Sequence, residues 1–167
     1  SPPKPSSAAS DVYKRQHLHS AVSAGEPLNR EVVEQFKNNF NLTVRDGYGQ
    51  TESTLLIGFL KDTEPRTGSM GKGIPGSFVT IIDDDGNEVP PQTKGNIAVP
   101  LDLPALFKGY YKDEERTKAA SAGDYYVTGD LAHKDEDGYF WFEGRRDDII
   151  ISSGSVSYTH LTLPTKA

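Results

Sequence analysis

The chain has 167 residues, with 18 basic and 24 acidic side chains, a net charge of −6 and no cysteine. This acidic balance provides no electrostatic footprint for nucleic acid or for an anionic membrane surface. The lack of cysteine excludes a disulfide framework and a thiol nucleophile. No apolar run approaches the ~20 residues that a membrane-spanning helix needs. The length suits one domain or a piece of a larger one.

The two ends of the chain can be encoded by one oligonucleotide read in opposite orientations. Residues 156–165 can be read back into DNA as GTC TCT TAT ACA CAT CTG ACG CTG CCG ACG. The complementary strand, in a shifted frame, encodes residues 7–15, SAASDVYKR. This oligonucleotide resembles a transposon-type adapter used to build sequencing libraries, and an ordinary low-complexity tail is the alternative. We therefore leave residues 1–16 and 155–167 out of the fold prediction and expect both to be disordered.

The first part of the remaining sequence predicts a strand, a helix and a second strand. Residues 18–24 form a short apolar run that ends at Gly25, and Asn29 is suited to cap a helix that follows. The apolar side chains at helical spacing are expected to lie in the core, namely Leu28, Val32, Val33, Phe36 and Phe40. Residues 42–44 read as the second strand, and residues 51–60 as a helix or turn after a glycine-rich bend. Open α/β sheets bind ligands beyond such a strand end.

From residue 67 onwards, turn signals separate short strands. Strands are expected at 78–83, 88–89, 95–100, 125–132 and 139–143. The Asp-rich turns at 84–87 and 135–138 could be calcium loops, but both lack the later bidentate glutamate of an EF-hand, so ordinary turn chemistry is favoured. Asp113 is expected to cap a short helix that runs to Ala120. The predicted fold class is therefore α/β, with a βαβ piece at 17–66 and a small antiparallel, β-barrel-like subdomain at 67–147.

Three short strings carry the chemistry of the chain. They are Tyr48-Gly49-Gln50-Thr51-Glu52, Thr128-Gly129-Asp130 and Gly144-Arg145-Arg146-Asp147-Asp148. An aromatic ring can lie flat on a purine, and a hydroxyl beside a carboxylate can meet a phosphate and its metal ion. A later aspartate suits a ribose diol because a carboxylate only accepts hydrogen bonds, and an arginine can hold the other side. The alternative is structural: Thr51 as a helix cap, Asp130 in a β-turn and Arg145 in a surface ion pair.

The order and spacing of these strings resemble the adenylate-forming (AMP-binding) acyl-CoA synthetases, most closely the medium-chain enzymes, from about residue 20 to residue 154. The resemblance implies the following nucleotide-binding residues: Gly25, Glu26, Pro27, Asp46, Gly47, Tyr48, Gly49, Gln50, Thr51, Asp130 and Arg145. It implies that Thr51 and Glu52 are catalytic and that Glu52 is a ligand of Mg²⁺. Residues 148–154 would form the hinge region and the start of a C-terminal domain.

The hinge itself is expected at Asp147, and CoA is expected to bind near Ser153 and Gly154. In the resembled family, a fatty carboxylate attacks the α-phosphate of ATP to give acyl-AMP, and the CoA thiol then takes the acyl group. Gly49 stands where acetyl-specific relatives tend to carry tryptophan, which favours a medium-chain substrate. The expected partners are therefore small molecules, with no nucleic acid and no membrane span.

The family's phosphate loop and catalytic lysine are not found in this sequence, so we expect the chain on its own to be inactive and the intact parent to be an acid–thiol ligase. The alternatives are a non-catalytic nucleotide-binding module, or another adenylate-forming enzyme such as an acetyl-CoA synthetase or aryl-CoA ligase. The expected location is the cytoplasm, or the mitochondrial matrix in a eukaryote.

Overall fold

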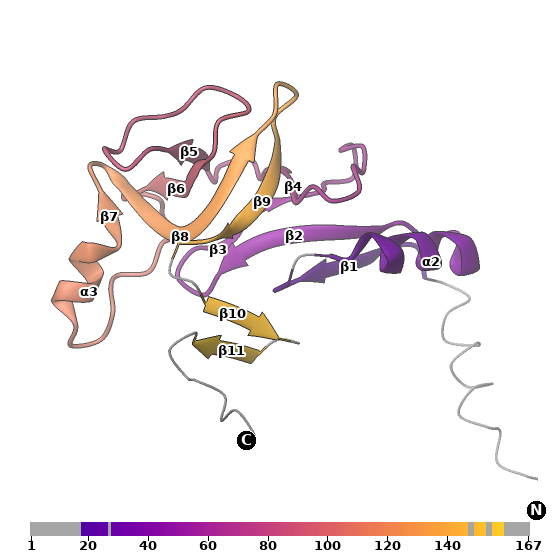
Figure 1. Ribbon diagram of the computed structural model, residues 1–167, viewed down its shortest axis with the longest axis horizontal. Helices are drawn as coiled ribbons and strands as arrows, with labels where there is room; N and C mark the ends of the chain where they lie inside the picture. Colours follow the sequence, from indigo (N-terminus) through magenta and orange to yellow (C-terminus); the bar gives the residue numbers. More distant parts are fainter. Residues whose placement is uncertain (1–17, 27, 147–148, 153–154, 159–167) are drawn as a thin grey trace, which may run out of the picture.

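A computed structural model describes residues 18–26, 28–146, 149–152 and 155–158 of the chain (Figure 1). The elements in chain order are β1 (Ala21–Ala24), α2 (Arg30–Phe40), β2 (Val44–Gln50), β3 (Thr54–Gly58), β4 (Gly71–Gly73), β5 (Thr80–Ile82), β6 (Gly95–Pro100), α3 (Glu114–Ala119), β7 (Ser121–Ala122), β8 (Tyr125–Lys134), β9 (Tyr139–Arg145), β10 (Ile149–Ser152) and β11 (Ser155–Tyr158). No helix among these residues is long and apolar enough to cross a membrane.

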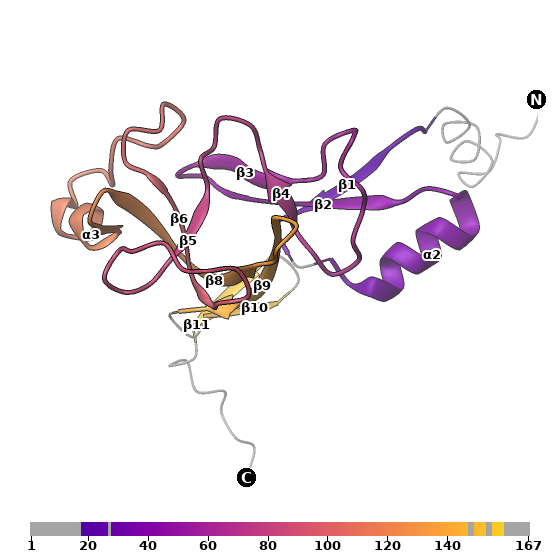
Figure 2. The ribbon, with the colours of Figure 1, turned by 90° about the horizontal axis from the view of Figure 1, so that it is seen from above.

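Nine strands form one mixed sheet in the order β1-β2-β3-β4-β9-β8-β6-β5, with β7 paired to β8 off this path. Strands β1 and β2 are parallel and are joined through α2, which confirms the predicted βαβ piece. The later strands pair antiparallel, so the α/β class is confirmed as well. The order runs from β1 to β5 without returning, so the described strands form an open sheet rather than the expected barrel-like unit (Figure 2). Strands β10 and β11 form a separate antiparallel pair.

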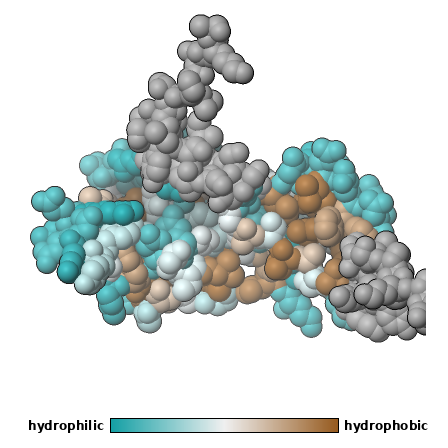
Figure 3. Space-filling model, turned by 90° about the horizontal axis from the view of Figure 1, so that it is seen from below, coloured by the Kyte–Doolittle hydropathy of each residue, from teal (hydrophilic) through white to brown (hydrophobic). Residues whose placement is uncertain are grey.

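Helix α2 begins where the capping residue predicts. The side chain of Asn29 accepts a hydrogen bond from the N–H of Glu31 at 2.8 Å, which satisfies one of the unpaired donors of the first turn. Of the five apolar side chains expected in the core, Val33 is buried, but Val32 and Phe40 are 40% and 45% exposed. That part of the prediction is wrong, because no described element covers the outer side of the helix. Figure 3 shows apolar residues gathered on the part of the molecule that holds β1, β2 and α2.

The core lies instead between the antiparallel strands. Its buried members are Leu56, Ile57, Met70, Ile81, Ile97, Val99, Leu103, Leu106, Tyr126, Ala132 and Phe140. Burying each large aliphatic or aromatic side chain stabilises the fold by roughly 1.5–3 kcal/mol. The core therefore ties together strands β3, β5, β6, β8 and β9, and it supports both of the later chemical strings.

Two local signals of the second half are confirmed. Asp113 caps α3 by accepting the N–H of Arg116 at 3.0 Å. In the first Asp-rich turn, Asp83 accepts the backbone N–H groups of Asp85 and Asn87 at 3.0 and 2.8 Å. These bonds close the turn through backbone donors.

The strand expected at 88–89 is not formed. Glu88 makes only an isolated bridge with Ile82.

For residues 51–60, where a helix or a turn is expected, the turn is confirmed and the helix is not. The segment makes a tight turn, closed by the N–H of Ser53 on the carbonyl of Gln50 at 3.1 Å, and then continues as β3. Leu56 and Ile57 are fully buried in the core, which favours the extended chain over a helix. Thr51 is therefore no helix cap, and no helix N-terminus is available here for a phosphate. The predicted ligand motif lies within β2 and its turn, not beyond a strand end.

Gly49 lets the two strands of this hairpin approach each other closely. A Cβ at this position would lie 2.0 Å from the carbonyl oxygen of Thr54, and the register shifts between Tyr48 and Gly49. A backbone oxygen at that distance cannot move aside as a flexible side chain can. Backbone approach is thus sufficient by itself to require glycine at this position.

Gly49→Ala is expected to lower the free energy of unfolding by about 1–3 kcal/mol, the range for forcing extra atoms into packed structure. Urea denaturation measures the effect. Gly58→Ala in the same hairpin is the matched control, because its Cβ would meet its nearest neighbour, Ile74, at an ordinary 3.5 Å. Equal stability of the two variants would contradict the close-approach argument.

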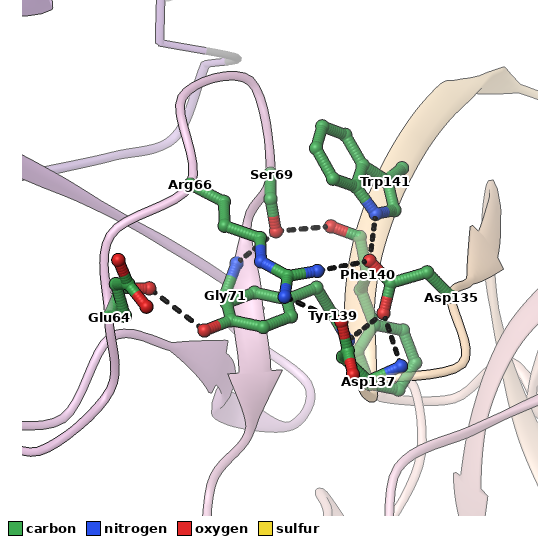
Figure 4. A network of polar contacts seen from close by, with 9 residues as sticks. All are labelled: Glu64, Arg66, Ser69, Gly71, Asp135, Asp137, Tyr139, Phe140 and Trp141. Atoms are coloured by element: carbon green, nitrogen blue, oxygen red, sulfur yellow. Dashed lines mark hydrogen bonds and ion pairs between the residues drawn. The ribbon is translucent and has the colours of Figure 1, made fainter.

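A polar network anchors the loop before β4 to the β8–β9 hairpin (Figure 4). Arg66 pairs with Asp135 at 3.0 Å and Asp137 at 2.6 Å, and its guanidinium lies 4.0 Å from the centre of the Tyr139 ring. Asp135 also accepts the indole N–H of Trp141 at 3.0 Å. The carboxylate of the second Asp-rich turn is thus engaged by protein donors, in agreement with its predicted turn role.

Asp135 predicts an acid-dependent part of the stability. Burial alone would raise the pKa of Asp135, but the N–H of Tyr139, the indole of Trp141 and the charge of Arg66 hold it below its ordinary value. Such a carboxylate adds stability above its unfolded pKa and loses it as the pH falls through the folded pKa.

Asp135→Asn is therefore expected to lower the Tm at pH 7, and the deficit should shrink once the pH drops below the ordinary aspartate pKa of about 3.9. Thermal unfolding followed by circular dichroism between pH 7 and pH 2.5 checks this. Asp137→Asn is the control, since Asp137 is exposed and its carboxylate pairs with Arg66 at the surface. A deficit that stays constant across this range would contradict the assignment.

Candidate functional site

A cavity opens between β2 and the β8–β9 pair. It encloses about 610 Å³, its open mouth included. Its lining residues are Gly25, Glu26, Asp46, Gly47, Tyr48, Gly49, Gln50, Met70, Asp130, Phe142 and Arg145. Residues from the turn after β1, from β2, from β8 and from β9 therefore meet at one place, although they are far apart in the sequence.

Nine of the eleven predicted nucleotide-binding residues line this cavity. Thr51 does not and is exposed in the turn that follows β2, and Pro27 lies outside the described residues. Sequence reasoning missed Met70 and Phe142, which add an apolar wall. Phe142 lies two residues after the buried Phe140, so strand alternation alone marks it as core. Met70 carries no signal in the sequence, because only the loop anchored by Arg66 brings it here.

Asp130 is the centre of the polar contacts in the cavity. The hydroxyl of Tyr48 donates to its Oδ2 at 2.6 Å, and the amide of Gln50 donates to the same atom at 2.8 Å. The guanidinium Nε of Arg145 lies 3.5 Å from Oδ1. Only 7% of the Asp130 side chain is exposed, so these donors compensate a carboxylate that has lost most of its water.

Backbone geometry brings Asp130 and Arg145 together. The two residues are direct partners across the β8–β9 ladder. Gly129 precedes Asp130 with φ of +79°, a conformation that favours glycine and turns the chain just before the carboxylate. The hydroxyl of Thr128 then accepts the N–H of Asp130 at 3.2 Å. The backbone turn at residues 128–130 thus places the carboxylate of Asp130 at the cavity.

Tyr48 stays protonated at Asp130. Burial raises the pKa of the Tyr48 phenol far above its ordinary value, and the neighbouring charge of Asp130 raises it further. The hydroxyl therefore remains a donor across the physiological range, and the aromatic ring is left to form a wall of the cavity.

Asp46 plays a different part from Asp130. Its carboxylate accepts the N–H of Gly47 at 2.8 Å and the N–H of Leu28 at 3.3 Å. Burial raises the pKa of Asp46, and these two backbone bonds oppose the rise. Asp46 thus ties the turn after β1 to β2, and it fixes the position of Gly25 and Glu26 on the cavity wall.

Glu52 lies outside the cavity lining. Its Oε1 accepts the hydroxyl of Tyr110 at 3.0 Å, and its backbone carbonyl accepts the N–H of Phe107 at 2.7 Å. No cluster of three or more histidine, cysteine, aspartate or glutamate side chains among the described residues could hold a metal ion. A Mg²⁺ ion held here would need phosphate oxygens beside the Glu52 carboxylate, which is a common arrangement for this ion.

The remaining predicted sites cannot be placed. Asp147, the expected hinge, and Ser153 and Gly154, the expected CoA contacts, lie outside the described residues.

Together, the mixed sheet and a cavity with an aromatic wall and an Asp–Arg pair have the features of an α/β nucleotide-binding protein. The chain belongs to the AMP-binding enzyme family, whose sequence profile matches residues 2–111.

Named relatives agree with this family. The chain is 65% identical over 137 residues to the uncharacterized acyl-CoA ligase YtcI of Bacillus subtilis (strain 168), covering 82% of this chain and 26% of that protein. It is 46% identical over 144 residues to the mitochondrial acyl-coenzyme A synthetase ACSM5 of Rattus norvegicus, covering 84% of this chain and 25% of that protein. The chain thus spans about a quarter of the length of these curated relatives.

Solved structures share the fold. An acyl-CoA synthetase of Brucella canis has 39% identity and a TM-score of 0.71, covering 84% of this chain and 26% of that chain. The anthranilate CoA ligase AuaEII in complex with anthranoyl-AMP has 30% identity and a TM-score of 0.69, covering 81% and 26%.

Proposed function

We propose that these residues form the nucleotide-binding side of an AMP-forming acyl-CoA synthetase. The observation that carries the proposal is the meeting of Tyr48, Asp130 and Arg145 at one cavity. Asp130 would accept hydrogen bonds from the ribose hydroxyls, and Arg145 would hold the sugar from the other side. The Tyr48 ring and the backbone edge at Gly25 and Glu26 would enclose the purine. Pro27 belongs to the same proposed edge.

The phosphate side of the site is proposed at the turn after β2. Thr51 would contact the α-phosphate, and Glu52 would be a ligand of Mg²⁺, which offsets phosphate charge when it is bound. Glu52 fits this role because its carboxylate is half-buried near the end of β2 and is oriented by Tyr110. Thr51 is exposed in the turn after β2 and caps no helix.

The proposed reaction has two steps. A fatty carboxylate attacks the α-phosphate of ATP, pyrophosphate leaves, and acyl-AMP forms. The CoA thiol then attacks the acyl carbon, loses its proton, and displaces AMP. Because a carboxylate has a poor leaving group and AMP is a good one, the first step makes the second possible. Positioning and electrostatic stabilisation would supply most of the rate.

A medium-chain fatty acid remains the proposed substrate, on the argument that glycine at Gly49 leaves room for an acyl chain. The close approach to Thr54 is a competing reason for the same glycine. Asp147 as hinge and Ser153 and Gly154 as CoA contacts are retained as proposals. The proposed location is the cytoplasm, or the mitochondrial matrix in a eukaryote, since the rat relative is named mitochondrial and another relative is bacterial.

Asp130→Ala is expected to weaken AMP binding by about 1.5–3 kcal/mol, the range for hydrogen bonds to a charged group, which is roughly 10- to 150-fold in Kd. Titration of the chain with AMP, followed by NMR, measures this into the millimolar range. Asp85→Ala is the control, because Asp85 is exposed in a distant turn. An unchanged affinity would make Asp130 a structural residue only and would contradict the proposed function.

A further inference from the structure

The side-chain amide of Gln50 is held by three hydrogen bonds. Its Nε2 donates to Oδ2 of Asp130 at 2.8 Å and to the carbonyl of Thr128 at 2.9 Å. Its Oε1 accepts the hydroxyl of Tyr126 at 3.1 Å. The nitrogen of a side-chain amide only donates hydrogen bonds, and its oxygen only accepts them. Two acceptors beside Nε2 and one donor beside Oε1 therefore fix the orientation of the Gln50 amide. The donor that fixes the oxygen side is Tyr126.

Tyr126 does not line the cavity, and its own surroundings fix it in place. Only 3% of the residue is exposed, and its ring packs edge-on against Phe107 with 5.5 Å between the centroids. Burial raises the pKa of the Tyr126 phenol well above its ordinary value, so the hydroxyl keeps its proton. The hydroxyl is thus a rigid and permanent donor behind the cavity wall.

We infer that Tyr126 is a positioning residue for ribose recognition. It fixes the amide of Gln50, and Gln50 in turn fixes the rotation of the Asp130 carboxylate. This inference rests on the proposed function, in which Asp130 accepts the ribose hydroxyls. A carboxylate rotates easily about its last side-chain bond. A donor that already fixes the Asp130 carboxylate lowers the entropy cost of ordering it when the ligand binds.

The test compares two ligands that differ in the sugar alone, AMP and 2′,3′-dideoxy-AMP. Tyr126→Phe removes the hydroxyl and keeps the ring in the core. We expect it to weaken AMP binding about three- to tenfold, the range for one hydrogen bond, and to leave dideoxy-AMP unchanged. Tyr125→Phe is the matched control one residue away, because its hydroxyl bonds to Glu88 at the surface. It should change neither affinity. NMR titration of the whole chain measures both ligands.

A variant of Gln50 keeps the inference testable if Tyr126→Phe fails to fold. Gln50→Met has a similar length and removes all three amide bonds, so it should show the same loss, confined to AMP. The double variant should bind AMP no more weakly than Gln50→Met alone, because the hydroxyl acts through the amide.

Three results would overturn the inference. Equal loss for both ligands means that the Tyr126 hydroxyl has a general structural role, and no loss for either means that it has none in binding. The third is seen before any substitution: if the unaltered chain binds AMP no better than dideoxy-AMP, the ribose role of Asp130 fails, and the proposed function fails with it. In the first two results the preference for AMP survives in Tyr126→Phe, so the positioning role alone fails.

Discussion

The nearly buried carboxylate of Asp130 is the constraint on which the rest of the site depends. It needs donors, and they come from β2 and β9 while Asp130 itself lies on β8. Strands β2 and β8 are separated by β3, β4 and β9 in the sheet. In a flat sheet, four spacings of about 4.8 Å would keep them roughly 19 Å apart. The 2.6 Å bond from Tyr48 to Asp130 therefore requires a strongly curved sheet. Curvature without closure explains why the pattern of strands resembles a barrel.

Several contacts between strands and loops support this curvature. Gly49 allows β3 to approach β2 closely beside the bulge in their register. At the other side, Arg66 binds the β8–β9 turn and so holds the loop that leads into β4, between β3 and β9. Met70 reaches the cavity as a consequence. A site made from strands that are distant in the sheet thus depends on contacts that never touch the ligand.

Features that depend only on residues close together in the chain were predicted correctly from the sequence. The strand at 95–100, the cap at Asp113 and both Asp-Gly turns follow from local propensity and were found as expected. Nine of the eleven residues predicted to bind a nucleotide also line one cavity, because they were chosen from strings in a fixed order. Residues 51–60 were ambiguous because threonine and glutamate suit a turn as well as a helix start, and only burial of Leu56 and Ile57 decides for a strand. The exposure of Val32 was equally hidden, since helical periodicity identifies an apolar face and not what covers it. The role of Tyr126 could not be predicted from the sequence, because its contact with Gln50 depends on how β8 lies against β2 in the folded chain.

The two aspartates of the cavity show why a motif does not assign a role by itself. Asp46 and Asp130 have the same chemistry and both line the cavity. Asp46 accepts hydrogen bonds from the backbone N–H groups of Gly47 and Leu28, which cannot turn away without unfolding the turn after β1. Two donors to Asp130 are the side chains of Tyr48 and Gln50, which reach it from another strand. The backbone donors to Asp46 belong to the turn that it closes, whereas the side-chain donors hold Asp130 in a set orientation at the cavity. Asp46 is therefore suited to build the wall of the site, and Asp130 to meet the ligand.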